Sequence, residues 1–179
     1  MEDGPRLKKG MVEVYTGNGR GKTTAAIGLA FRAVGHGLRV HIIQFMKGDI
    51  SYGEFQSCSA HPLIDIEQFG RKEFVNIHEP STVDVELAAK GLARAREVLT
   101  EGRADVVILD ELCVAVGFHL VTVEDVLGLL DIRPEHVELV ITGRMAPPEL
   151  LERADLVTEM REVKHPFHQG VLARTGIDN

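Results

Sequence analysis

Residues 17–24 of this chain read Gly-Asn-Gly-Arg-Gly-Lys-Thr-Thr, a glycine-rich run that ends in a lysine and two threonines. The β-favouring run MVEVY precedes it at residues 11–15, and an alanine-rich helical pattern follows over residues 22–34. A strand, a glycine-rich loop and a helix in this order favour phosphate binding, because inward-facing backbone amides and the helix dipole attract an anion. The stretch therefore predicts a phosphate-binding loop, and a turn that merely caps a helix is the weaker interpretation.

The side chains of this loop suit a nucleotide phosphate and its metal ion. Lys22 carries a mobile positive charge for phosphate oxygens, and Thr23 offers a hydroxyl to Mg²⁺. Thr16 stands where the pattern G-x-x-x-x-G-K-[ST] has its first glycine, so this loop begins differently from that of common nucleotide hydrolases.

Two further stretches place polar groups after apolar strands. The run DVVILD at residues 105–110 ends in Asp110 and is followed by Glu111, and a strand that ends in an acid is typical of a Mg²⁺ site beside a phosphate loop. A solvated acid pair at a turn is the alternative. The run ELVIT at residues 138–142 is followed by Gly143 and Arg144, for which nucleotide contact and a solvated arginine are equally open.

Apolar runs and helical patterns alternate along the rest of the chain. Further strands are expected at residues 39–45, 63–69 and 156–163, helices at 82–99, 122–130 and 147–154, and loops at 49–60 and 71–80. The central strands are apolar throughout, which is typical of a mainly parallel sheet covered on both faces. We expect a three-layer α/β fold of the P-loop NTPase (RecA-like) type, with one domain over residues 11–179 and an N-terminal arm over residues 1–10.

Composition narrows the classes of function. The formal net charge of −7 argues against non-specific binding to nucleic acid or to an anionic membrane. Because only 5% of the residues are aromatic and Trp is absent, the core should be aliphatic. Cys58 and Cys113 have no metal-ligand spacing; two free thiols suit a reducing cytoplasm, and a single disulfide is the alternative. We find no leader and no apolar run long enough for a membrane helix, so a cytoplasmic protein is expected.

Four stretches together resemble one known family. They are TGNGRGKTTAAIGLAFRAVGHGLRVHIIQFMKG at residues 16–48, VVILDEL at 106–112, VITGR at 140–144 and VKHPFHQGVLARTGID at 163–178. In order and spacing they resemble the phosphate-loop corrinoid adenosyltransferases, also called cob(I)yrinic acid a,c-diamide adenosyltransferases. The resemblance extends over nearly the whole chain, and Thr16 is itself typical of the family.

The resemblance implies an enzyme of cobalamin biosynthesis or salvage. Such enzymes transfer the 5′-deoxyadenosyl group of ATP to Co(I) of a corrinoid, either cobalamin or cobyrinic acid a,c-diamide, and release tripolyphosphate. The γ-phosphate lies deep in the loop and the ribose C5′ faces the cobalt, which is the nucleophile, so the protein supplies position and charge neutralisation. A homodimer and a flavoprotein electron donor are also implied.

The resemblance also assigns roles to residues. Lys22, Thr23 and Glu111 are catalytic, with Thr23 and Glu111 as Mg²⁺ ligands and Asp110 supporting them. The residues implied in ATP binding are Gly17, Asn18, Gly19, Arg20, Gly21, Lys22, Thr23, Thr24 and Arg144.

The family's corrinoid-facing aromatic pair, in a GFTW-like segment, is matched only loosely. This chain reads Phe69-Gly70-Arg71-Lys72-Glu73-Phe74 there and lacks the Trp. Phe69, Arg71 and Phe74 are the corrinoid-binding candidates, and packing under a loop is the alternative role of the two phenylalanines.

Two other functions compete with adenosyl transfer. In a RecA-like ATPase or GTPase, Asp110 and Glu111 would hold Mg²⁺ and activate water, but the loop that begins with Thr16 counts against this. A nucleotide sensor would bind ATP without turning it over.

Overall fold

The computed structural model describes residues 6–73, 75 and 79–178, and its centre is a parallel β-sheet. The sheet has six strands in the order β3-β2-β4-β5-β1-β6, and each neighbouring pair is parallel. The strands are β1 (Val12–Thr16), β2 (Val40–Phe45), β3 (Ile64–Phe69), β4 (Val106–Asp110), β5 (Glu138–Thr142) and β6 (Leu156–Glu159). The predicted α/β fold with a parallel sheet is therefore confirmed.

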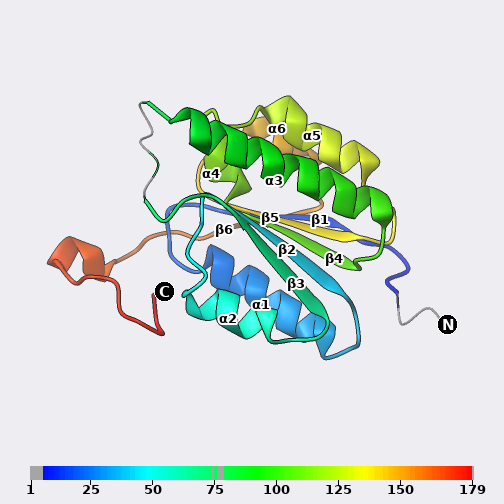
Figure 1. Cartoon of the computed structure of the whole chain (residues 1–179), viewed down its shortest axis with the longest axis horizontal. Helices are drawn as coiled ribbons and strands as arrows, with labels where there is room; N and C mark the ends of the chain where they lie inside the picture. Colours follow the sequence, from blue (N-terminus) through cyan, green and yellow to red (C-terminus); the bar gives the residue numbers. More distant parts are fainter. Residues whose placement is uncertain (1–5, 74, 76–78, 179) are drawn as a thin grey trace.

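Helices cover both faces of this sheet (Figure 1). One face carries α1 (Lys22–Val34) and α2 (Gly53–Ser59). The other carries α3 (Thr82–Glu101), α4 (Leu112–Gly117), α5 (Val123–Ile132) and α6 (Pro148–Arg153), and a 3₁₀ turn, η1 (Pro166–Gln169), follows β6. The buried residues form one cluster in each of the two helix–sheet interfaces.

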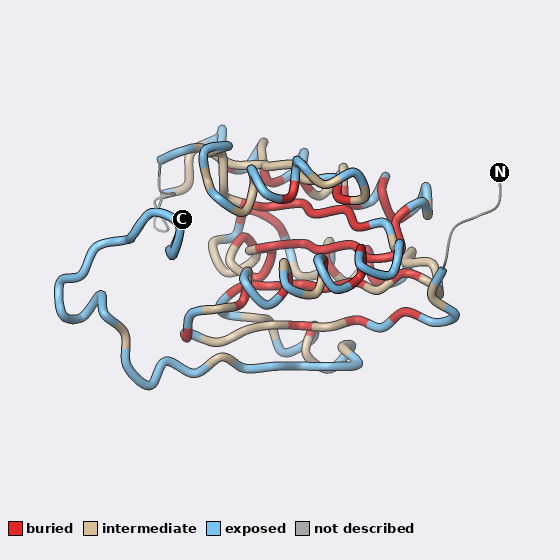
Figure 2. The backbone as a smooth tube through the Cα atoms, turned by 90° about the horizontal axis from the view of Figure 1, so that it is seen from below, coloured by how far each residue is buried: buried red, intermediate tan, exposed pale blue. Residues whose placement is uncertain are grey.

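The core is aliphatic, as the composition predicts. Phe45 is the one aromatic residue among the buried hydrophobic residues of the described part of the chain. Figure 2 shows burial concentrated in the central strands, whereas the segment after β6 is exposed along most of its length. Cys58 and Cys113 are both free and buried, and burial raises their thiol pKa values to about 11 and about 12.

Helix ends follow the sequence where capping signals are strong. Ser81 and Thr122 cap α3 and α5, each in a capping box with an aspartate three residues later. By contrast, the N-cap of α1 is Gly21, with φ 116° and no side-chain cap, because the first turn of α1 continues the phosphate loop.

Two expectations about secondary structure are wrong, and one helix lies where no element was expected. Residues 49–60 contain α2 and are not all loop; its N-cap Tyr52 gives no side-chain hydrogen bond, and the element depends instead on packing of the fully buried Cys58. Helix α4, which follows Glu111 directly, was not expected. Strand β6 ends at Glu159, although residues 156–163 had been expected to form the strand.

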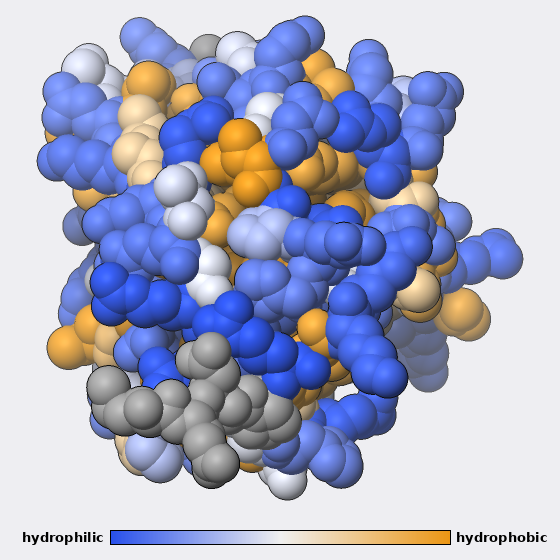
Figure 3. Space-filling view, turned by 90° about the vertical axis from the view of Figure 1, so that its right-hand side faces the viewer, coloured by the Kyte–Doolittle hydropathy of each residue, from blue (hydrophilic) through white to orange (hydrophobic). Residues whose placement is uncertain are grey.

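Because all strands run in the same direction, the loops after β1 to β5 share one edge, on the left of Figure 1. The opposite end of the molecule, seen in Figure 3, is covered mainly by hydrophilic side chains. No helix of the described residues has the length and apolarity needed to span a bilayer.

Candidate nucleotide and metal site

The phosphate loop joins β1 to α1 and is packed closely against the chain after β6. Gly17 has φ 94°, and a Cβ there would lie 2.5 Å from the carbonyl oxygen of Met160. A Cβ at Gly19 would lie 2.7 Å from the same oxygen, to which the Gly19 N–H donates at 2.6 Å. These two glycines are therefore required by the approach of residue 160 as well as by the turn.

Lys22 lies inside this loop and is only 7% exposed. Its Nζ donates to the carbonyl oxygens of Gly17 and Gly19, each at 2.7 Å. Burial lowers the pKa of the ammonium, while the carboxylate of Glu111 acts in the opposite direction. The ammonium is thus held by carbonyl oxygens that phosphate oxygens can replace.

Asp110, at the end of β4, is 1% exposed and accepts four hydrogen bonds. Its Oδ1 accepts from the hydroxyls of Thr23 at 2.8 Å and Thr142 at 2.7 Å. Its Oδ2 accepts from Gln44 Nε2 and Lys47 Nζ, both at 3.0 Å. Burial alone would raise the pKa of this carboxyl, but Lys47 and the hydroxyls outweigh burial and lower it.

Glu111 follows with a left-handed backbone, φ 61°, and is the N-cap of α4. Its N–H donates to Thr142 Oγ1 at 3.0 Å, so the hydroxyl that binds Asp110 also fixes the backbone of Glu111. Burial and the neighbouring Asp110 raise the pKa of the Glu111 carboxyl, and Lys47 and Lys22 oppose this. An additional cation near Glu111 would favour its ionised form.

These contacts fit a magnesium site. The Thr23 hydroxyl donates a hydrogen bond to Asp110, which leaves the lone pairs of the Thr23 oxygen available to a metal. A carboxylate has about four acceptor positions, so the four donors leave Asp110 little capacity to bind a metal directly. Thr23 and Glu111 are therefore the residues that could hold a metal ion, and the hydrogen bond to Asp110 orients the Thr23 hydroxyl.

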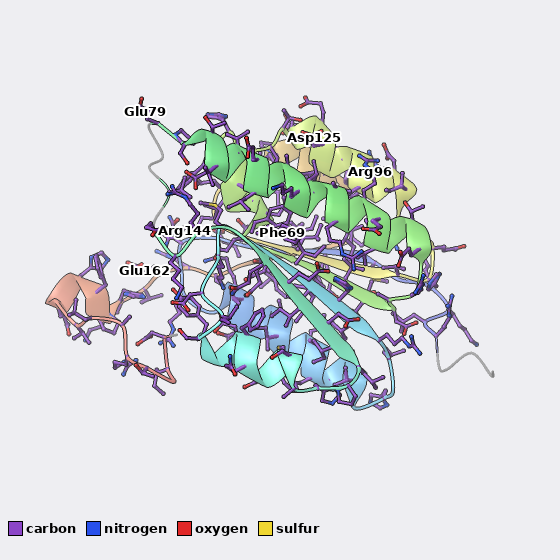
Figure 4. The ribbon with its side chains drawn as sticks, in the orientation of Figure 1. Phe69, Glu79, Arg96, Asp125, Arg144 and Glu162 are labelled. Atoms are coloured by element: carbon purple, nitrogen blue, oxygen red, sulfur yellow. The ribbon has the colours of Figure 1, made fainter. Side chains whose placement is uncertain are left out.

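Arg144 and Asn18 lie at the same edge and line an open cavity of about 430 Å³. Its other lining residues, Glu159, Arg161 and Glu162, come from the chain at and after the end of β6. Figure 4 shows Arg144 and Glu162 on the side of the molecule where the strands end. The sequence predicted Asn18 and Arg144 as site residues but not these three. The signal that could have identified them is a run of charged residues directly after an edge strand.

The remaining loop residues face outward. Arg20 is exposed and pairs with Asp178 near the C-terminus, with 2.8 Å between Nη1 and Oδ1, and it also donates to the carbonyl of Ile177. Thr24 is exposed in the first turn of α1. Arg20 and Thr24 are thus exposed residues of the phosphate loop, and neither is among the donors to Asp110.

The corrinoid-binding candidates lie on and after β3. Phe69, at the end of β3, is half-buried and packs against α3, where a Cβ at Gly91 would lie 3.1 Å from Phe69 Cβ. Arg71 donates to Asp84 through Nε at 2.8 Å and Nη2 at 3.0 Å, and this pairing lowers the pKa of Asp84 to about 2. Phe74 lies outside the described residues.

Sequence reasoning missed two residues that bind Asp110. Gln44 is a fully buried amide in the otherwise mostly apolar β2, and Lys47 follows that strand by two residues. A polar residue in a buried strand and a lysine just after it were the available signals.

Comparison with known proteins agrees with this geometry. The family model described as "ATP:corrinoid adenosyltransferase BtuR/CobO/CobP" matches residues 8–179. The chain is 39% identical to "Corrinoid adenosyltransferase" of Escherichia coli (strain K12) over 178 residues, which cover 96% of this chain and 86% of the relative. It is 38% identical to "Corrinoid adenosyltransferase CobA" of Salmonella typhimurium, with the same coverage of both chains. It is also 35% identical to "Corrinoid adenosyltransferase" of Pseudomonas aeruginosa over 97% of this chain and 85% of the relative. The chain therefore belongs to the ATP:corrinoid adenosyltransferase family.

Proposed function

We propose that this protein transfers the 5′-deoxyadenosyl group of ATP to Co(I) of a corrinoid and releases tripolyphosphate. The cobalt of the corrinoid substrate attacks the ribose C5′, the bond from C5′ to the triphosphate oxygen breaks, and the leaving group keeps that electron pair. No protein nucleophile is needed. The chain's own residues bind the triphosphate, neutralise its charge and hold C5′ open to the corrinoid.

The observation that carries the proposal is the convergence of Lys22, Thr23 and Glu111 beside one loop. Lys22 is held in the loop, Thr23 is bonded to Asp110, and Glu111 acts electrostatically on Lys22. In our proposal the loop residues 17–24, Asn18 among them, bind the phosphates with the γ-phosphate innermost. Arg144, which lines one cavity with Asn18, binds a more outward part of ATP. This orientation leaves C5′ at the strand-end edge, where a large corrinoid has access.

Magnesium completes this proposal. Mg²⁺ would be held by Thr23 and Glu111, and it would supply positive charge to the triphosphate. Asp110 accepts a hydrogen bond from the Thr23 hydroxyl at 2.8 Å, which would leave the lone pairs of that oxygen available to the metal.

The corrinoid side of the proposal rests on the segment after β3. Phe69 and Phe74 would supply apolar contact to the macrocycle. Arg71 already holds the start of α3 through Asp84, so we assign it a role in fixing the shape of the corrinoid-binding surface after β3. We further propose a cytoplasmic homodimer, one catalytic domain over residues 11–179 with an arm at residues 1–10, and a flavoprotein as electron donor.

An anaerobic assay with chemically reduced corrinoid tests the function. Loss of the Co(I) absorbance should require MgATP and should produce adenosylcorrinoid and tripolyphosphate in equal amounts. The Lys22→Ala variant should lose this reaction, whereas Lys90→Ala, which removes an exposed lysine of α3, should retain it. Release of phosphate or pyrophosphate without corrinoid would instead identify a nucleotide hydrolase.

A further inference from the structure

Lys47 lies between two acids at the end of β2. Its Nζ is 3.0 Å from Asp110 Oδ2 and 3.2 Å from Glu54 Oε1 in the first turn of α2. The lysine side chain is 18% exposed, and Asp110 is almost completely buried. Burial alone would lower the pKa of this ammonium, but the two carboxylates outweigh it and raise the pKa. Lys47 is therefore a charged partner of the acid behind the magnesium site.

The backbone around Lys47 is tightly held. Met46 has φ 59°, and the loops after β2 and β3 pack backbone against backbone at Gly48 and Gly70. A Cβ at Gly48 would lie 2.3 Å from the Gly70 carbonyl oxygen, and a Cβ at Gly70 would lie 2.4 Å from the Lys47 nitrogen. Because these loops have little freedom to shift, the ammonium is kept beside Asp110.

The hydrogen bonds divide the two oxygens of Asp110 between separate tasks. Oδ1 accepts from Thr23 and Thr142, and Oδ2 accepts from Gln44 and Lys47. Without the ammonium, Oδ2 would keep one amide donor and a full share of negative charge. Such an oxygen beside a divalent cation would attract the cation and compete with the Thr23 hydroxyl for it.

We propose that Lys47 is a positioning residue that neutralises Asp110 and so keeps Asp110 an acceptor for Thr23 instead of a direct metal ligand. This inference rests on the proposed magnesium site. According to this inference, the loop after β2 controls how tightly the site binds Mg²⁺. The ion is held by Thr23 and Glu111 and can still exchange together with the nucleotide.

The test uses the full-length protein without corrinoid. Calorimetry measures ATP binding over a series of Mg²⁺ concentrations for the wild type, Lys47→Met and Lys47→Arg. The Met variant keeps the approximate length of the side chain and loses its charge. The Mg²⁺ concentration at half-maximal effect should fall about tenfold in Lys47→Met, the size expected for removing one nearby positive charge. Lys47→Arg should stay within about twofold of the wild type, because the charge is retained.

Lys72→Met is the matched control. Lys72 belongs to the neighbouring loop, and its side chain is 66% exposed and lies 3.5 Å from Asp49. Its loss should leave the Mg²⁺ dependence unchanged. If Lys47→Met does not fold, as judged by circular dichroism, Lys47→Gln keeps a donor for Asp110 and should show the same tightening.

Three results would overturn the inference. They are an unchanged or weaker response to Mg²⁺ in the neutral variants, an equal shift in Lys47→Arg, and an equal shift in Lys72→Met. If the wild type bound ATP without any response to Mg²⁺, the proposed metal site would fail together with this inference. If the wild type responded and Lys47→Met matched it, only the role of Lys47 would fail.

Discussion

Asp110 and Glu138 are carboxylates of neighbouring strands, β4 and β5, and their environments shift their pKa values in opposite directions. Asp110, at the carboxyl end of β4, receives four hydrogen bonds, one of them from an ammonium. Glu138, at the start of β5, receives one from the Met11 N–H and faces another acid, Glu13. The pKa of Asp110 is lowered, while that of Glu138 rises from 4.5 to about 7.

The causes explain the contrast. Partial burial raises the pKa of Glu138 most, and the hydrogen bond and charge of Glu13 raise it further. The Met11 N–H and the charge of Arg133 oppose these effects but do not cancel them. Burial acts in the same direction on both acids, so the number and charge of the donors decide which one is ionised. Donors are gathered at the edge of the sheet where the phosphate loop lies.

Removing Asp110 should produce the largest change in stability. Asp110→Ala would remove the acceptor of the buried Gln44 amide and would leave the Lys47 ammonium with Glu54 as its one remaining acid partner among the described residues. We expect a loss of about 4 kcal/mol in the free energy of unfolding, measured by urea denaturation near neutral pH.

The matched control for that variant is Asp131→Ala. Asp131 pairs with Arg153 at 2.6 Å, but the aspartate side chain is 62% exposed. Its removal should leave the unfolding midpoint nearly unchanged, since exposed pairs contribute little. Equal effects of the two substitutions would contradict the role we assign to the Asp110 donors.

Glu111→Gln should affect activity more than stability. The substitution keeps the size of the side chain and removes a proposed metal ligand, so MgATP-dependent adenosyl transfer should fall roughly 100-fold. Corrinoid binding measured without Mg²⁺ should not change. An adenosyl-transfer rate close to that of the wild type would exclude Glu111 as a ligand.

The site acids were predictable from sequence because motif and topology agree. A phosphate loop after one parallel strand and an acid after another must meet at one edge of the sheet, so Lys22, Thr23, Asp110 and Glu111 could be grouped without coordinates. Topology also places Lys47, just after β2, at this edge, but its pairing with Asp110 was not predictable. Its position depends on the closely packed loops around Gly48 and Gly70, which no local pattern encodes.

Arg71 illustrates the same limit on prediction. A basic residue in a loop after β3 suggested a ligand contact, but its partner Asp84 lies 13 residues further along the chain in α3. The position of α2 was missed because its sequence has weak helix signals and its stability comes from tertiary contacts. Local sequence signals thus predicted the phosphate-binding loop. Which charged side chains pair with each other depends on tertiary packing, which local signals do not show.

Glu138→Gln should stabilise the protein at alkaline pH. Because the pKa of Glu138 is about 7 in the folded chain and 4.5 ordinarily, the folded chain binds more protons between these values. Stability should therefore fall as pH rises through this window, and the full cost remains above pH 7. Glu138 is only partly buried, so we expect a gain of about 1 kcal/mol at pH 8 and little change at pH 4. Urea unfolding at both pH values measures this, and a larger gain at pH 4 would contradict the assignment.

Replacing Asp178 should have the smallest effect on stability, because the arginines that pair with it are exposed. Its carboxylate pairs with Arg20 of the phosphate loop at 2.8 Å and with Arg174 at 2.9 Å, and the Arg20 side chain is 45% exposed. Solvent screens such a pair, so Asp178→Asn should leave the urea midpoint unchanged. Tryptic cleavage after Arg174 should become about two- to fivefold faster, and added salt should reduce the difference from the wild type. If Asp178→Asn lowered the free energy of unfolding as much as Asp110→Ala, the number of buried donors would not explain the different contributions of these two acids to stability.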